Sequence, residues 1–191
     1  APKCTFYMWF WAVQYTLITD SLPAIALGID TPDKDIMKEK PRDSNESFFA
    51  HGAGLRAVIG GVLIGIMTLV AFYIGISEYG YSLSSDNIPD GVITEGRTMA
   101  FVVLAVSQLF YSLSMRHESK SIFQIGIFTN KYLVMAISIG FLLQISVIQI
   151  PVLAAAFKVQ PLTMGHWQTV IMLAVVPLII NEILKLLRRK A

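Results

Sequence analysis

Five long apolar segments dominate the sequence and constrain its fold more than any other feature. A helix needs about 20 predominantly apolar residues to cross the hydrocarbon core of a bilayer. Only 15% of the 191 residues are charged, whereas a soluble domain carries about a quarter. We therefore predict an all-α integral membrane fold, a bundle of five transmembrane helices in a lipid bilayer. The helices run approximately over Thr5–Leu27, Leu55–Ile76, Met99–Leu113, Tyr132–Ile150 and Trp167–Leu187.

The composition argues against several other kinds of protein. The single cysteine, Cys4, excludes an internal disulfide and a cysteine metal cluster. A net charge of +2 without a basic stripe gives no indication of nucleic-acid binding. The apolar amino-terminal stretch has neither a basic leader nor a small-x-small cleavage pattern. We therefore expect a retained helix there rather than a signal peptide.

The basic residues predict the orientation of the bundle. Twelve of the fifteen Lys and Arg residues fall on one side of the predicted helices. They lie in the loop after the first segment and at the next helix start, in the loop of residues 114–131, and in the carboxy-terminal tail. Because cytoplasmic loops carry the excess of Lys and Arg, we expect an external amino terminus and a cytoplasmic carboxy terminus.

Asp20 is the polar residue most indicative of function. A carboxylate within a membrane helix is costly unless it faces a partner, water or an ion. Thr16 lies one helical turn earlier on the same face. Pro23 cannot donate a hydrogen bond to the carbonyl of Thr19. Carboxylate, hydroxyl and freed carbonyl oxygens are the ligands of hard cations such as Ca²⁺. The alternative is that Asp20 only caps a helix end.

The other polar residues in the apolar segments give weaker indications. Gln108 and Gln144 are neutral amides, which in membrane helices more often make interhelical hydrogen bonds than bind ions. Near the end of the last segment, Glu182 and Lys185 are expected to form a polar cluster at the membrane interface. Gly61 and Gly65 have the G-x-x-x-G spacing that permits close helix contact, although glycine is also simply common in membrane helices.

Residues 18–43, which read ITDSLPAIALGIDTPDKDIMKEKPRD, carry a specific family resemblance. They closely resemble the end of the sixth transmembrane helix and the following cytoplasmic loop of P-type ATPases of the calcium and sodium-pump group. The resemblance covers about residues 16–190, corresponding to helices six to ten. Downstream landmarks agree with it: Arg56 followed by Gly60-Gly61, the run Thr98-Met99-Ala100, and the run Asn181-Glu182-Ile183-Leu184-Lys185.

The resemblance implies a division of the chain into three parts. Residues 1–29 correspond to family helix six, with an atypical first 15 residues. Residues 30–54 correspond to a cytoplasmic loop, within which Pro32–Arg42 resembles the segment that meets the phosphorylation domain. Residues 55–191 correspond to helices seven to ten. We expect an integral, multi-pass protein of a bacterial plasma membrane.

The resemblance also implies ion ligands for a Ca²⁺ transporter. Asp20 and Thr19 match the family's Asp and Thr ligands, and Thr16 stands where the family has Asn. Gln108 falls where two-site calcium pumps have Glu, which weakens it as a metal ligand. This departure resembles pumps that move one Ca²⁺ per cycle.

The machinery for ATP hydrolysis does not occur in the sequence. The family's phosphorylated aspartate lies in an Asp-Lys-Thr-Gly-Thr run, which is missing here, as is any P-loop. We therefore expect no catalytic and no cofactor-binding residue in the chain. ATP and Mg²⁺ would act only through helices one to five and the cytoplasmic domains, which are the implied partners. The alternatives are a truncated, stand-alone membrane scaffold or binding module and, less favoured, a small carrier, for which no inverted repeat is found.

The predicted orientation can be tested with single cysteines at positions 44 and 84, in a variant in which Cys4 is replaced by serine. Ser44 and Ser84 fall in loops that we place on opposite sides of the membrane. A membrane-impermeant thiol reagent added to sealed vesicles should label one of the two positions and not the other. Labelling of both from the same side would overturn the orientation.

Overall fold

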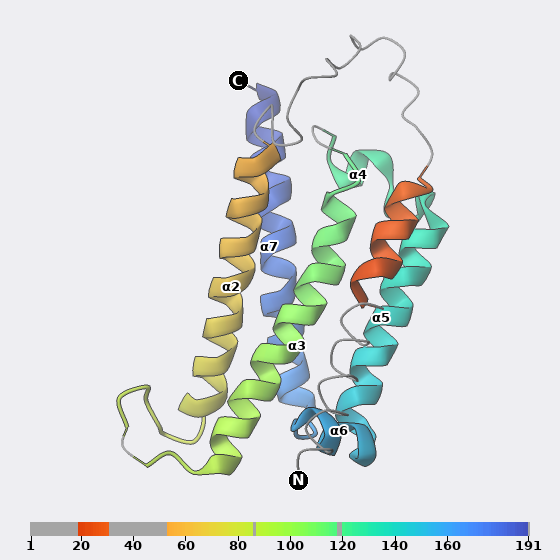
Figure 1. Ribbon diagram of the computed structural model, residues 1–191. Helices are drawn as coiled ribbons and strands as arrows, with labels where there is room; N and C mark the ends of the chain where they lie inside the picture. Colours follow the sequence, from red (N-terminus) through yellow and green to blue (C-terminus); the bar gives the residue numbers. More distant parts are fainter. Residues whose placement is uncertain (1–18, 31–52, 86, 118–119, 191) are drawn as a thin grey trace.

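The computed structural model describes residues 19–30, 53–85, 87–117 and 120–190 (Figure 1). These residues are helices and short connections, with no strand among them. Four of the helices are long and apolar enough to cross a membrane. They are α2 (Ala53–Ser77), α3 (Asp90–Ser114), α5 (Lys131–Gln149) and α7 (Met164–Lys190). The chain is therefore an all-α, multi-pass membrane protein.

Short helices join the long ones and position their ends. α4 (Ile122–Ile125) and the 3-10 helix η3 (Ile127–Thr129) lie between α3 and α5, and α6 (Pro151–Phe157) lies between α5 and α7. Residues 19–28 are helical and run beside α5 (Figure 1). There Ala26 packs against Leu133 and Ala136. Most of the first predicted segment, Thr5–Leu27, lies outside the described residues.

The other four predicted segments are found as helices, and the third is longer than predicted. We predicted Met99–Leu113, but α3 begins at Asp90. The apolar criterion stopped at Glu95 and Arg97, whereas the helix continues beyond them. Pro89 precedes the first turn of α3. The negative charge of Asp90 in that turn stabilises the helix, because the amino terminus of a helix carries a partial positive charge. The extra turns bring polar side chains to one end of the bundle.

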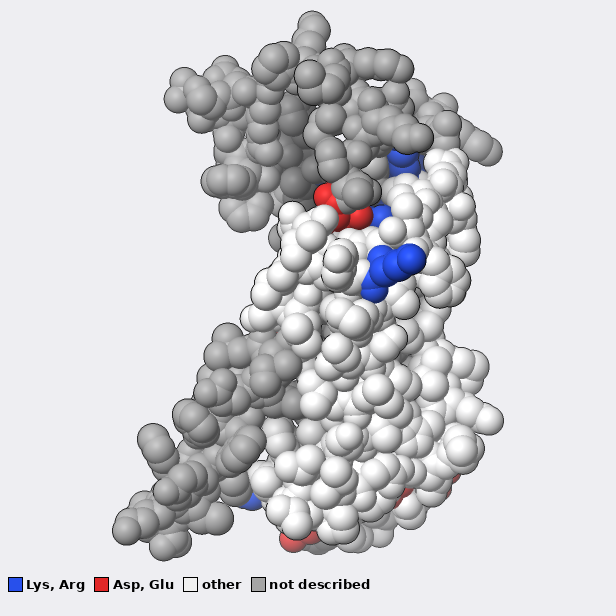
Figure 2. All heavy atoms as spheres, turned by 90° about the vertical axis from the view of Figure 1, so that its right-hand side faces the viewer, with Lys and Arg blue, Asp and Glu red and all other residues white. Residues whose placement is uncertain are grey.

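α3 is the central helix of the described bundle. Val102, Val103 and Val106 are fully buried in the core that α3 forms with parts of α2 and α7. Outward-facing residues of α2 are apolar, with Leu69 70% exposed. Figure 2 shows a broad middle zone without charged side chains on the face in view, and charges toward the two ends. This distribution is the one expected for a protein that crosses a hydrocarbon layer.

Two glycines permit the closest approach of α2 and α3. A Cβ atom added at Gly75 would lie 2.7 Å from the Cα of Gly96, and one added at Gly96 would lie 3.1 Å from the Phe72 carbonyl oxygen. By contrast, Gly61 and Gly65 have nothing within 4 Å of an added Cβ. The G-x-x-x-G spacing noted in the sequence therefore marks an open face in the described structure, and the close contact lies elsewhere.

Gly75→Ala should lower the free energy of unfolding by about 1–3 kcal/mol, because the added methyl group forces the two backbones apart. Gly61→Ala is the matched control on the same helix, and should be neutral or slightly stabilising because alanine favours a helix over glycine. Unfolding of the purified chain in detergent, followed by circular dichroism, gives both values. Equal effects of the two substitutions would contradict the close contact.

Candidate functional site

The predicted ion ligands lie on two separate elements. Thr19 and Asp20 begin the described part of the first helix, where Thr19 is buried and Asp20 is exposed. Gln108 is also exposed, on α3. Thr16 lies outside the described residues. No hydrogen bond or ion pair joins Asp20 to Gln108 in the part of the chain that the structure describes.

Asp20 does not belong to a cluster of acidic, His or Cys side chains that could hold a metal ion among the described residues. Among the described residues, no three His, Cys, Asp or Glu side chains lie together in positions that could hold a metal ion. Asp20 is therefore an acidic side chain on the outer surface of the described helices, next to the exposed apolar residues Ala24 and Ile25. A cation there would need oxygen ligands from outside the described residues, because Ca²⁺ takes six to eight.

The end of the Asp20 helix is bonded to the connection between α3 and α5. The Arg116 guanidinium donates to both carboxylate oxygens of Asp30, at 2.7 and 3.2 Å, and to the Gly126 carbonyl at 3.0 Å. Asn130 donates through Nδ2 to the Ala26 carbonyl at 2.9 Å. These contacts link segments that lie 86 and 104 residues apart in the sequence.

A buried carboxylate, Glu182, ties α7 to α3 and α4 at the same end of the bundle, called here the Glu182 end. Its Oε1 accepts from Ser114 Oγ at 2.5 Å and from Lys185 Nζ at 2.9 Å. Its Oε2 accepts from Ser121 Oγ at 2.7 Å and from the Ile122 amide at 2.9 Å. The predicted Glu182–Lys185 cluster is therefore confirmed, and it joins three elements rather than one helix face.

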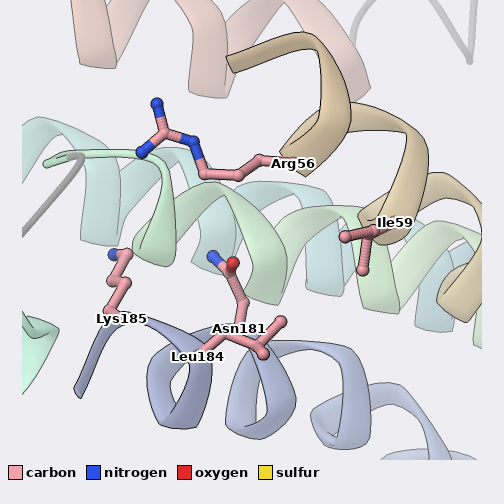
Figure 3. Close-up of a pocket in the computed structure, with 5 residues that line it drawn as sticks. All are labelled: Arg56, Ile59, Asn181, Leu184 and Lys185. Carbon is pink, nitrogen blue, oxygen red and sulfur yellow. The ribbon is translucent and has the colours of Figure 1, made fainter. Parts of the chain in front are cut away.

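A small pocket opens beside this cluster, between α2 and α7. Figure 3 shows its five lining side chains: Arg56, Ile59, Asn181, Leu184 and Lys185. Two of them are cationic, and one of these, Lys185, is paired with Glu182. The hydrogen bonds of Glu182 make the Glu182 end a junction of α3, α4 and α7.

A second polar cluster lies at the opposite end, called the His166 end. His166 is buried, with Nε2 2.7 Å from Glu78 Oε2 and Nδ1 3.0 Å from Glu95 Oε1. Tyr79 donates its hydroxyl to Glu95 Oε2 at 2.6 Å. This bond and the charge of Glu95 raise the pKa of Tyr79 above its ordinary value. The sequence alone gives no sign of this cluster, because its members are isolated polar residues and Glu78 and His166 are 88 residues apart.

Comparison with known proteins identifies a family model and several curated relatives that match most of the chain. The family model described as cation transporting ATPase, carboxy terminus, matches residues 14–187. A calcium-transporting ATPase of Bacillus cereus is 47% identical over 91% of this chain and 20% of its own length. One from Bacillus subtilis is 37% identical over 84% and 17%, and one from Listeria monocytogenes is 35% identical over 91% and 18%. The chain thus spans about a fifth of the length of these curated relatives.

Glu182→Gln should lower the free energy of unfolding by about 3–5 kcal/mol, because it leaves the buried Lys185 ammonium without its counter-charge. The double variant Glu182→Gln/Lys185→Met buries no unpaired charge and should recover much of that loss. Unfolding in detergent measures both. A double variant as unstable as the single one would show that the charge pairing is not the cause.

Proposed function

The chain belongs to the cation-transporting ATPase family, as its carboxy-terminal membrane part, and on this premise we propose that it works within an ATP-driven Ca²⁺ pump. In that pump, the helix that carries Asp20 supplies ion ligands. The loop that follows this helix couples it to ATP hydrolysis. The observation that carries the proposal is the exposed Asp20 carboxylate in the described part of the first helix, beside the exposed apolar residues Ala24 and Ile25. The relatives' names, calcium-transporting ATPases, favour Ca²⁺ as the cation.

The remainder of the pump is the proposed partner. It would contain helices one to five, which would complete the oxygen shell around Ca²⁺, and the cytoplasmic domains, which would bind ATP and Mg²⁺. On this proposal the chain does not hydrolyse ATP by itself. The loop of residues 30–54 faces the cytoplasm of a bacterial cell, as does the carboxy terminus, so that the loop can meet the phosphorylation domain.

The ligand roles follow from charge. A carboxylate offsets the cost of removing water from a divalent cation far better than a neutral oxygen does. Asp20 is therefore the essential ligand, and the hydroxyl groups of Thr16 and Thr19 add neutral oxygens. Gln108 has no charge to offer and at most assists, which fits transport of one Ca²⁺ per cycle.

In the complete pump, Asp20→Asn should reduce ATP-driven Ca²⁺ uptake into sealed vesicles at least about 100-fold, the loss corresponding to roughly 2.7 kcal/mol. This substitution keeps the shape of the side chain and removes its charge. Gln108→Ala, a substitution at the other exposed candidate ligand, should cost much less. Normal uptake by Asp20→Asn would show that Asp20 is a helix cap and that the ion is bound elsewhere.

A further inference from the structure

The end of the Asp20 helix is held by a charged pair that is largely removed from solvent. The side chains of Arg116 and Asp30 are only 4% and 18% exposed. The guanidinium bonds Asp30 through two nitrogens, and a two-point contact of this kind fixes orientation as well as distance. A third nitrogen donates to the Gly126 carbonyl, which anchors Arg116 to the connection between α3 and α5.

Asn130 caps two helices at once. The last four carbonyl groups of a helix have no intrahelical donor. At the end of residues 19–28, the carbonyls of Ile25 and Leu27 accept from the following turn, and the Ala26 carbonyl accepts from Asn130 Nδ2. The Oδ1 atom of the same Asn130 accepts from the Leu133 amide in the first turn of α5. One buried side chain therefore sets the height of one helix against the other.

These contacts act on the ion-binding part of the helix through its rigidity. Asp20 lies six residues before Ala26, which is about 9 Å along a helix. Asp30, at the other side of the contacts, is the first residue of the predicted cytoplasmic loop of residues 30–54. A binding site works only when its side chains are held to within about 0.5 Å. A helix in lipid that lacked these bonds would keep its burial but could slide or rotate.

We propose that Arg116 and Asn130 are positioning residues for the transported cation, although neither touches it. Through Asp30 and the Ala26 carbonyl they fix the height and rotation of the helix that presents Asp20. This inference rests on the proposed function as a Ca²⁺ pump. Its consequence is that ion affinity depends on the connection between α3 and α5.

The test uses the complete pump with Arg116→Gln, which removes the charged pair, and Asn130→Asp. The latter keeps the oxygen that caps α5 but cannot donate to Ala26. Each should raise the Ca²⁺ concentration for half-maximal uptake about five-fold or more, a typical size for coupling between separate sites. The maximal uptake rate at saturating Ca²⁺ should change little. Arg97→Gln, at an exposed arginine near the opposite end of α3, is the matched control and should leave both values unchanged.

A further pair of variants separates positioning from general stability. Asp30→Asn should shift the half-maximal Ca²⁺ concentration as Arg116→Gln does, and the double variant should shift it no further, because both remove the same contact. Unchanged Ca²⁺ affinity in Arg116→Gln and Asn130→Asp would overturn the inference and leave the proposed function intact. Loss of folding in both would also overturn it, because the contacts would then be purely structural. A parent pump that takes up no Ca²⁺ would refute the proposed function, and this inference with it.

Discussion

Removing a charged group from water is costly unless it is paired and hydrogen-bonded, and two clusters of such groups lie at the two ends of this bundle. At the Glu182 end, two serine hydroxyls, a backbone amide and the Lys185 ammonium satisfy a single carboxylate. At the His166 end, one imidazole lies between two carboxylates. Both clusters join helices that are distant in sequence, and between them α3 is surrounded by apolar contacts. The polar groups thus join particular helices at the two ends of the bundle, and between the ends the helices are joined by apolar packing and by the contact of Gly75 with Gly96.

Asp20 departs from this pattern, and the departure links the structure to function. Its carboxylate is exposed, whereas Glu182, Glu95 and Asp30 are all paired. The helix that carries Asp20 is nevertheless held firmly at its end by Arg116 and Asn130. A fixed helix with an exposed acidic group is suited to a site that is completed by another part of a larger protein. The relatives, about five times longer than the stretch they share with this chain, have room for such a part.

The sequence was sufficient for the fold class, four of the five helices and the family, because apolar length and a long specific motif are local signals. It also placed Glu182 with Lys185, which lie three residues apart on one helix. It could not reveal Arg116 with Asp30 or His166 with Glu95, because a single sequence holds no record of contacts between distant residues. The start of α3 was missed because Glu95 and Arg97 lie within a helix that extends past its apolar stretch. Gly61 and Gly65 show the converse, because their spacing permits a close helix contact that the described residues do not make.

Equilibrium Ca²⁺ binding in the absence of ATP is the decisive measurement for the role of Asp20, because it separates the ion site from the chemistry that drives transport. The complete pump should bind one Ca²⁺ per molecule. The present chain alone, at the same free Ca²⁺ concentration, should bind none, since Asp20 then lacks the remaining oxygen ligands. Binding by the chain alone as tight as that of the complete pump would show that Asp20 needs no ligands from the rest of the pump. The absence of binding by the complete pump would show that Asp20 belongs to no Ca²⁺ site.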